Sequence, residues 1–325
     1  MAHGTIGRLR SMLAGSLAGA AVLALTGGPA AAKTTLSVYT AIEADDLKKY
    51  SARFNEDSPD IEIKWTRDST GVVTAKLLAE KANPQADVIW GLAATSLLVL
   101  KPEGMLVPYA PKGLEKLSAQ FRDGASPPAW VGMDAWVAAI CFNTAEAAKK
   151  SLPKPTSWKD DVSSWLQLFG EAEGWKYMDA LHENIAVYVH SGSKPCAMAG
   201  SGEYPIGVSF EFRAARQKKQ GAPLDIVFPS EGSGWDMEAT AIVKGTKNLE
   251  AAKTLVDWSV SEKAMKLYNE GYAVLAIPGI AKPIEFLPTN MLEHMAKNDF
   301  QWAATNRAKI LAEWEKRYNT KAEKK

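Results

Sequence analysis

The sequence has few cysteines and histidines, almost no net charge and, beyond its first residues, no long apolar run. Its 325 residues include 2 Cys and 4 His, and 38 Lys and Arg balance 37 Asp and Glu. Two cysteines exclude a small disulfide-framed fold. The balanced charge argues against binding to nucleic acid, which normally needs a basic face. The length is sufficient for one large domain or two of ordinary size.

The N-terminal residues have the pattern of a secretory signal peptide. Arg8 and Arg10 precede an apolar run over residues 12–25, and Ala30–Ala32 provide a small-residue cleavage site. A membrane anchor is the alternative, but the run is shorter than the roughly 20 apolar residues that cross a bilayer. We therefore predict a signal peptide over residues 1–32, cleavage near Ala32 and an exported, periplasmic protein.

Export bears on the two cysteines, because disulfide bonds persist in oxidising compartments. The sequence does not give the separation of the two Cα atoms, which a bridge restricts to a narrow range. Two free buried thiols are therefore the alternative. On the expected location we predict a disulfide between Cys141 and Cys196.

The first part of the mature chain alternates between short apolar strands and amphipathic helices. Strands are predicted over residues 36–39, 61–65 and 87–90, and helices over residues 47–54, 71–81 and 95–100. Such alternation is typical of a parallel sheet with helices on both faces. The predicted fold class is α/β.

The rest of the chain combines long helices with isolated strands. Residues 134–142 form a long apolar strand pattern, and residues 319–325 are expected to be a solvated tail. The other expected elements are strands over 205–210, 224–228 and 238–243, and helices over 164–184, 249–268 and 299–318.

Hydroxyl-bearing loops give the first indication of a site. Ligands of open parallel sheets bind beyond the carboxyl ends of the strands, which here directs attention to the loop at 67–71. Ser69 and Thr70 stand before a helix that begins at Gly71, so its first N–H groups can bind an anion. An ordinary helix cap is the alternative. A second loop with hydroxyl groups and glycine, Ser191–Pro195, also precedes a short helix.

Sequence motifs for catalysis are missing. There is no Gly-x-Ser-x-Gly elbow, His-Glu-x-x-His pair, Walker loop or Gly-x-Gly-x-x-Gly after a strand. His190 with Ser191 or Ser193 is the best pair for a hydrolase, but adjacent residues seldom address one reacting atom. Glu211 and Asp236 have no spacing that favours a glycosidase pair. We predict a binding protein rather than an enzyme, with no metal and no cofactor.

Several segments carry a resemblance to a known family. They are residues 38–45, 65–71, 83–95, 128–143, 191–196, 210–213 and 234–245. Over nearly the whole mature chain the sequence resembles the 2-aminoethylphosphonate-type substrate-binding proteins of bacterial ABC importers. Ferric-iron binders of the same superfamily use paired tyrosines, and this sequence has no such pair at these motifs.

The resemblance implies a type II periplasmic-binding fold, in which two α/β lobes joined by hinge strands enclose a ligand cleft. Lobe 1 would comprise residues 33–136 and 238–325, and lobe 2 residues 137–237. The protein would be a monomer that delivers 2-aminoethylphosphonate, or a related phosphonate or phosphate ester, to the transmembrane permease subunits of an importer.

The resemblance also implies a set of ligand-binding residues. The phosphonate would be bound by Ser69, Thr70, Gly71 and Thr95 from lobe 1 and by Ser191 and Ser193 from lobe 2. The ammonium would meet a carboxylate, either Glu43, Glu211 or Asp236, and the faces of Tyr39, Trp130, Phe212 or Trp235. Arg67 and Arg213 would orient the carboxylates. Core packing is the alternative role for the aromatic residues.

One departure from the family pattern concerns lobe 2. A strand and a Ser-Gly-Thr-Gly loop that family members have are missing near residues 160–162, which predicts a shortened lobe 2. Two alternative functions therefore stay open: an exported hydrolase of phosphorylated or acylated small molecules, and a transport-incompetent relic that lacks part of lobe 2.

Overall fold

A computed structural model describes residues 33–156 and 165–324. The predicted signal peptide over residues 1–32 and the predicted shortening near residues 160–162 lie outside the described residues. From Lys33 onward the chain forms one compact unit.

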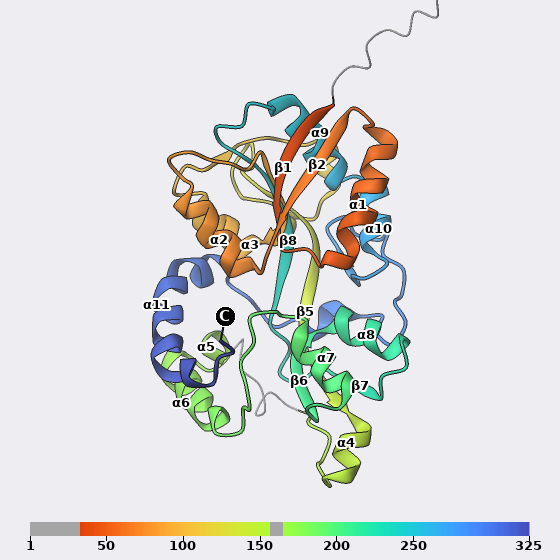
Figure 1. Cartoon of the computed structure of the whole chain (residues 1–325), viewed down its shortest axis with the longest axis vertical. Helices are drawn as coiled ribbons and strands as arrows, with labels where there is room; N and C mark the ends of the chain where they lie inside the picture. The colour runs from red at the N-terminus through yellow and green to blue at the C-terminus, as the bar shows by residue number, and fades with distance from the viewer. Residues whose placement is uncertain (1–32, 157–164, 325) are drawn as a thin grey trace, which may run out of the picture. The chain divides into compact units, whose positions relative to one another are not determined.

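The strands of the described residues, in chain order, are β1 (Thr34–Thr40), β2 (Ile61–Arg67), β3 (Val88–Ala93), β4 (Leu106–Val107), β5 (Val131–Asn143), β6 (Ile206–Phe210), β7 (Leu224–Val227), β8 (Trp235–Val243) and β9 (Val274–Leu275). The path through the sheet is β2-β1-β3-β8-β5-β6, with β4 on β8 and with β7 and β9 on β5. Figure 1 shows β5 and β8 side by side near its centre.

The helices, in chain order, are α1 (Ala44–Asp57), α2 (Thr70–Ala79), α3 (Ala94–Leu100), α4 (Thr144–Lys149), α5 (Trp165–Leu168), α6 (Glu171–His182), α7 (Lys194–Ser201), α8 (Glu211–Lys219), α9 (Leu249–Ser259), α10 (Glu262–Tyr268) and α11 (Phe300–Tyr318). In Figure 1, α2 and α3 lie on one side of β1 and β2, and α1 and α10 lie on the other. None of these helices has the length and apolar character needed to cross a membrane.

The sheet is only partly parallel. β1 pairs in parallel with β2 and β3, as the strand and helix alternation predicts. From β3 onward the pairing is antiparallel: β3 with β8, and β8 with β5. The parallel pairing predicted for the first three strands is therefore confirmed, and the strands that join this sheet later in the chain are antiparallel. The reason is that β5 leaves this part of the sheet and β8 returns to it, so the two strands run in opposite directions.

Strand β5 contributes residues to three hydrophobic cores, since its alternate side chains face opposite sides of the sheet. Its first half, with Val131 and Met133, packs into the large core of strands β1, β3 and β8. Ala138, Ile140 and Phe142 pack into a second core. Cys141 lies in a third core and forms a disulfide with Cys196 of α7, across a Cα–Cα distance of 5.4 Å.

Two predicted helices are interrupted. The pattern over residues 164–184 contains a break between α5 and α6, where Gly170 has a φ of +80°. The pattern over residues 249–268 breaks between α9 and α10, where the Ser261 side chain accepts a hydrogen bond from the Ala264 N–H group. The apolar spacing of the sequence continues through both breaks, so the pattern alone indicates one helix in each place.

Residues 319–323 are not a solvated tail as predicted. Tyr188 and Ala322 form a parallel bridge. The Tyr188 N–H donates to the Lys321 carbonyl at 2.9 Å, and the Glu323 N–H donates to the Tyr188 carbonyl at 2.8 Å. A charged, apolar-poor segment is held here by backbone hydrogen bonds, which the sequence pattern does not reveal.

Candidate functional site

A cavity of about 200 Å³ lies among the starts of α3, β8 and α11. We call it the tryptophan cavity. Its lining residues are Thr95, Trp136, Gln167, Gly234, Trp235, Asp236, Ala296, Lys297, Asn298 and Ala303. Three residues predicted to bind ligand, Thr95, Trp235 and Asp236, therefore meet at one cavity.

Asp236 supplies the buried charge of the tryptophan cavity. Its carboxylate accepts hydrogen bonds from the Thr95 hydroxyl at 2.6 Å and from the Met237 N–H at 2.7 Å. Burial raises the pKa of Asp236 to about 6, although the hydrogen bond from Thr95 opposes that rise. The carboxylate remains mostly ionised at neutral pH, so it can accept a hydrogen bond from a cationic ligand group.

Two half-buried indole rings, Trp136 and Trp235, form the aromatic part of the cavity lining. The Trp235 indole N–H donates to the Ala296 carbonyl at 2.8 Å, and its ring packs edge-on against Phe300 at 4.8 Å. Asn298 donates to the Trp235 carbonyl at 2.6 Å. Trp235 is thus fixed in orientation, and its ring and that of Trp136 offer aromatic surface next to the Asp236 carboxylate.

The start of α2 has hydrogen-bond donors without an acceptor in the part of the chain that the structure describes. Ser69 is the N-cap residue, yet its side chain makes no capping hydrogen bond. The Ser69 N–H donates to its neighbour Asp68. Among the described residues none accepts a hydrogen bond from the N–H groups of Thr70, Gly71 or Val72. Ser69 and Thr70 are half-buried and Gly71 is exposed, so an anion can reach these donors.

An arginine from the other end of the chain lies beside this helix start. The Arg307 guanidinium of α11 is 3.7 Å from the position that a Cβ atom on Gly71 would occupy. Arg307 forms no ion pair with any of the described residues, and burial lowers its pKa. Ala303, one helical turn before Arg307, lines the tryptophan cavity. The exposed donors of α2 and the tryptophan cavity are therefore linked along one face of α11.

Sequence reasoning missed Arg307 although a signal was present. On α11 the apolar residues with helical spacing are Phe300, Ala304, Ile310, Trp314 and Tyr318. Ala304 is buried, and the other four pack into the cores. Arg307 stands within this stripe at the same spacing. A lone cation on an apolar helix face needs a partner or a ligand, so its position could have marked the site. The sequence contains no comparable signal for three other residues that line the tryptophan cavity, namely Trp136, Lys297 and Asn298.

The second predicted hydroxyl loop, Ser191–Pro195, is connected to the tryptophan cavity by the ring of Phe210. The Ser191 and Ser193 hydroxyl groups are 3.1 Å apart and hydrogen-bonded to each other. Gly192 between them packs on the Phe210 ring, and that ring contacts Trp136 with a centroid distance of 4.6 Å. The loop therefore packs on a ring that contacts the cavity residue Trp136.

Three other predicted ligand residues lie apart from the tryptophan cavity. Tyr39 is buried, and its hydroxyl donates to Glu80 at 3.0 Å. Trp130 is also buried in the large core. Glu43 is half-buried at the start of α1 and forms an ion pair with Arg67 at 3.5 Å. The structure thus gives the two aromatic residues the packing role that was their alternative.

Glu211 and Phe212 lie at the start of α8, also outside the tryptophan cavity. The Glu211 carboxylate accepts a hydrogen bond from the Val137 N–H at 2.7 Å, and burial raises its pKa to about 8. Phe212 stacks on Phe210 at 5.6 Å and contacts Tyr272 at 4.7 Å. Arg213, predicted to orient a carboxylate, lies 3.9 Å from Asp45.

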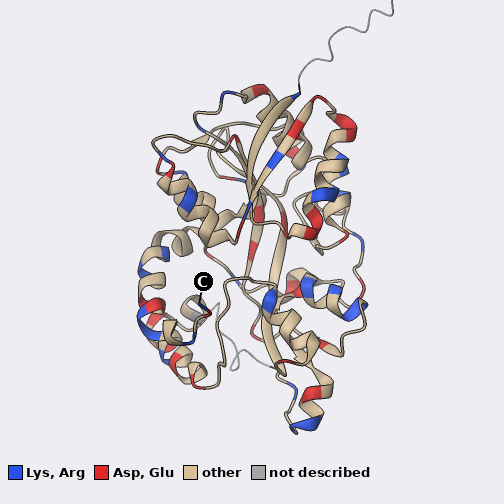
Figure 2. Cartoon of the chain, in the orientation of Figure 1, with Lys and Arg blue, Asp and Glu red and all other residues tan. Residues whose placement is uncertain are grey.

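Acidic side chains are also buried where β5 and β8 pair. Asp134 stands directly opposite Glu238, and Tyr272 donates to Glu238 at 3.0 Å. Burial and the neighbouring carboxylates raise the pKa of Asp134 well above its ordinary value, and burial raises that of Glu238. Figure 2 shows acidic residues on these central strands, whereas both signs are mixed on the helices. Burial at the pairing of β5 and β8 therefore favours the neutral form of both carboxyl groups.

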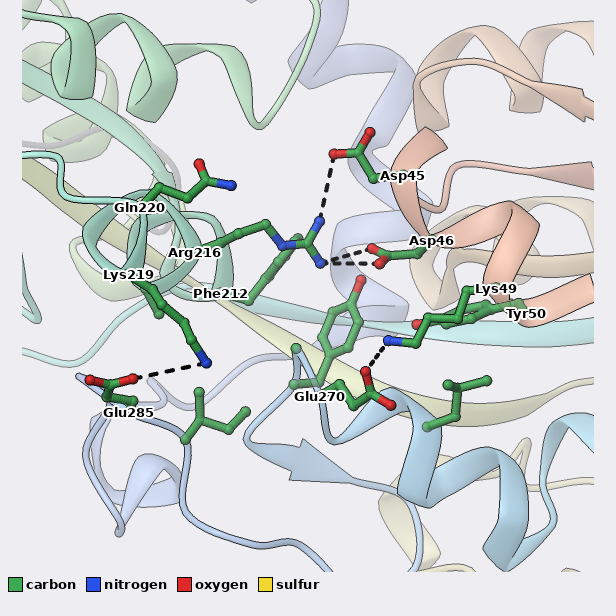
Figure 3. Close-up of a pocket in the computed structure, with 15 residues that line it drawn as sticks. Asp45, Asp46, Lys49, Tyr50, Phe212, Arg216, Lys219, Gln220, Glu270 and Glu285 are labelled. Carbon is green, nitrogen blue, oxygen red and sulfur yellow. Dashed lines mark hydrogen bonds and ion pairs between the residues drawn. The ribbon is translucent and has the colours of Figure 1, made fainter. Parts of the chain in front are cut away.

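A larger cavity, of about 470 Å³, lies between α1, α8 and the segment after α10. We call it the ion-pair cavity, and Figure 3 shows its charged side chains directed at one another. Arg216 binds both carboxylate oxygens of Asp46, at 3.0 and 3.1 Å. Lys49 pairs with Glu270, and Lys219 with Glu285 at 4.0 Å. The charges of this cavity are thus already neutralised by partners in the protein.

The pairing that a hydrolase would need is not formed in the described residues. His190 is exposed, and no hydrogen bond joins its imidazole to the hydroxyl of Ser191 or Ser193. No group of three or more His, Cys, Asp or Glu residues in the described part of the chain could hold a metal ion. The tryptophan cavity is lined by polar side chains, among them Asp236 and Asn298, that hydrogen bonds hold in place.

Comparisons with known proteins agree with a binding role. Residues 40–266 match the model of the family of bacterial extracellular solute-binding proteins. An uncharacterized protein of Haemophilus influenzae is 29% identical over 325 aligned residues, which cover 90% of this chain and 93% of that protein. A probable ABC transporter periplasmic-binding protein of Sinorhizobium fredii, y4fP, is 26% identical over 236 residues, 64% of each chain.

Solved structures share the fold. The periplasmic binding protein AfuA from Actinobacillus pleuropneumoniae superposes with a TM-score of 0.81 at 24% identity, covering 89% of this chain and 99% of AfuA. The periplasmic binding protein P5PA gives a TM-score of 0.77 at 22% identity, over 88% of this chain and 100% of P5PA. The predicted type II periplasmic-binding fold is confirmed. The family match extends over most of the chain, which therefore belongs to the bacterial extracellular solute-binding proteins.

Proposed function

We propose that this protein captures a small phosphonate or phosphate ester, with 2-aminoethylphosphonate as the first candidate, and delivers it to the permease of an ABC importer. The proposal rests on the Arg307 guanidinium, which has no ion-pair partner among the described residues. It lies next to the N–H groups at the start of α2, from which none of those residues accepts a hydrogen bond. A dianion placed there gains charge-assisted hydrogen bonds from both.

The opposite end of a zwitterionic ligand would enter the tryptophan cavity. Of the three candidate carboxylates, Asp236 lines this cavity, whereas Glu211 is buried behind Val137 and Glu43 is paired with Arg67. An ammonium group can be held by the Asp236 carboxylate and by the faces of Trp136 and Trp235. Thr95 lies between the start of α2 and the tryptophan cavity, since it donates to Asp236 and stands in the first turn of α3, which contacts α2.

Two findings from the comparisons support the ligand class and the role. AfuA, which shares the fold, is described with fructose-6-phosphate bound, so one relative of this architecture holds a phosphorylated small molecule. The Sinorhizobium relative is described as a probable ABC transporter periplasmic-binding protein. Family members bind small ligands and permease components, and we extend both partners to this chain as a monomer in the periplasm.

We further propose that the fold has two lobes, with residues 33–136 and 238–325 in lobe 1 and residues 137–237 in lobe 2. With these bounds β5 and β8 pass from one lobe to the other. Arg307 would then contribute to ligand capture from a helix that also reaches lobe 2. The second half of α11, with Ile310, Trp314 and Tyr318, packs into the core around Ile140 and Trp175. With these bounds α2 and Arg307 both belong to lobe 1, so closure of the cleft would bring Ser191 and Ser193 of lobe 2 to a ligand held there.

Isothermal titration calorimetry on the protein without residues 1–32 tests the proposal. The probes are 2-aminoethylphosphonate, ethylphosphonate, fructose 6-phosphate and inorganic phosphate. We expect the tightest binding with 2-aminoethylphosphonate and weaker binding with ethylphosphonate, which lacks the ammonium. Preference for fructose 6-phosphate would change the ligand but keep the anion site. Failure to bind any of the four would overturn the proposed function.

A further inference from the structure

One carboxylate bridges both ends of the Ser191–Ser193 loop. Oε1 of Glu323 accepts a hydrogen bond from the His190 N–H at 2.6 Å, and Oε2 pairs with the Lys194 ammonium. His190 directly precedes the loop and Lys194 directly follows it. The ammonium of Lys194 and the hydrogen bond from His190 both lower the pKa of Glu323, so the carboxylate is ionised at neutral pH.

Glu323 is itself held firmly by its surroundings. Its backbone N–H donates to the Tyr188 carbonyl, and Tyr188 forms a parallel bridge with Ala322. A few residues earlier, Tyr318 is buried and donates to Asp179 at 2.7 Å. The carboxylate therefore acts from a fixed position rather than from a loose side chain.

The loop has one further support, on the side of the tryptophan cavity. Ser209 donates to the Gly192 carbonyl at 2.6 Å. A Cβ atom on Gly192 would lie 2.4 Å from the Phe210 ring, so the backbone rests directly on that ring. Because Phe210 contacts Trp136 of the cavity, a displacement of the loop would alter the distance between its hydroxyl groups and a bound ligand.

We propose that Glu323 is a positioning residue for solute capture: its carboxylate fixes both ends of the Ser191–Ser193 loop and so orients the two hydroxyl groups toward the ligand. The inference rests on the proposed function, because it takes the loop as part of the ligand site. It adds a residue that does not touch ligand but sets the geometry of residues that do.

Binding of 2-aminoethylphosphonate by four variants tests the inference. We expect Glu323→Gln to weaken binding about tenfold, because the pair with Lys194 is lost and one end of the loop is released. Lys194→Met should give a smaller loss, and the double variant should bind no more weakly than Glu323→Gln alone. Glu323→Asp keeps the charge and should recover part of the affinity. Binding by Glu323→Gln equal to that of the wild type would overturn the inference.

Glu313→Gln is the matched control, since Glu313 pairs with Arg317 within α11 and has no hydrogen bond or ion pair with the Ser191–Ser193 loop. It should bind as the wild type does. Hydrogen–deuterium exchange of the ligand-free protein gives a second readout, in which Glu323→Gln speeds exchange in residues 190–194 and Glu313→Gln does not. If the wild type binds none of the probes, the proposed function fails, and unchanged exchange in Glu323→Gln would separately reject the positioning role.

Discussion

The two cavities differ in whether their charged groups already have partners. In the ion-pair cavity, Arg216 is bonded to both oxygens of Asp46, and two lysines face glutamates. In the tryptophan cavity and along the adjoining face of α11, Asp236 is bonded only to neutral donors and Arg307 has no ion-pair partner among the described residues. The larger cavity is the more charged of the two and the less available to a charged ligand.

The difference follows from the cost of removing charges from water. A buried or half-buried charge without a counter-charge is unfavourable, and a protein usually removes it by pairing. Arg216 and Asp46 follow that rule and join α8 to α1. Arg307 departs from it, which is the pattern expected where a ligand supplies the missing charge. Cavity volume by itself would select the ion-pair cavity, whose charges already have partners.

The largest expected effect is on ligand affinity in Arg307→Gln. Loss of the guanidinium removes a charge-assisted contact to the dianion, and we expect 2-aminoethylphosphonate to bind about a hundredfold more weakly. Calorimetry measures the change, and the thermal midpoint of unfolding without ligand should stay close to that of the wild type. An unaltered affinity would remove Arg307 from the site and with it the contrast between the two cavities.

The second effect is on the stability of the fold at Glu211. The residue before Glu211, Phe210, contacts Trp136 of the tryptophan cavity, and the residue after it, Phe212, lines the ion-pair cavity. The pKa of Glu211 is about 8 in the folded protein, above its ordinary value. The folded state thus binds the extra proton, and stability is lost as pH rises from the ordinary pKa through about 8. Glu211→Gln keeps an acceptor for Val137 and should be about 2 kcal/mol more stable than the wild type near pH 8.

Denaturant unfolding at several pH values checks this prediction. The stability gain of Glu211→Gln should shrink toward pH 5, where the wild-type carboxyl is protonated in the folded state. A gain that does not depend on pH would mean that Glu211 is not protonated in the fold. Glu43→Gln is the control, because Glu43 is half-buried and paired with Arg67.

A third and smaller effect distinguishes the two ends of the ligand. Asp236→Asn retains a hydrogen-bond acceptor for Thr95 but loses the charge, so 2-aminoethylphosphonate should bind about tenfold more weakly. Ethylphosphonate, which has no ammonium, should lose little. In the wild type the preference for the aminated ligand should decline as pH falls below about 6, where Asp236 becomes protonated. Equal losses for both ligands would contradict a role in ammonium binding.

The smallest effect is expected in the ion-pair cavity. Arg216→Gln removes the pair with Asp46, whose side chain is 13% exposed, and we expect a loss of about 1 kcal/mol in the free energy of unfolding. The affinity for 2-aminoethylphosphonate should change less than about twofold. A large loss of affinity with unchanged stability would show that this cavity, and not the tryptophan cavity, binds the ligand.

The sequence predicted most helices and strands because apolar spacing is a local property. The first three strands and helices fall where the pattern indicates them, and hydroxyl groups do stand before α2. The breaks at Gly170 and Ser261 were missed, since spacing continues across them. The antiparallel pairing of β8 has no counterpart in the local sequence pattern, because pairing direction depends on where the chain goes between strands.

What the sequence determined by itself is the type of fold and the kind of groups available: hydroxyls, amide donors, carboxylates and aromatic rings. Only the tertiary structure decided which of them meet. Packing placed Asp236, and not Glu43 or Glu211, at the tryptophan cavity. It also buried Tyr39 and Trp130 in the core and brought Arg307 beside Gly71. The physical reason is that periodicity follows from neighbouring residues, whereas the partners of a charge follow from contacts between segments far apart in the chain.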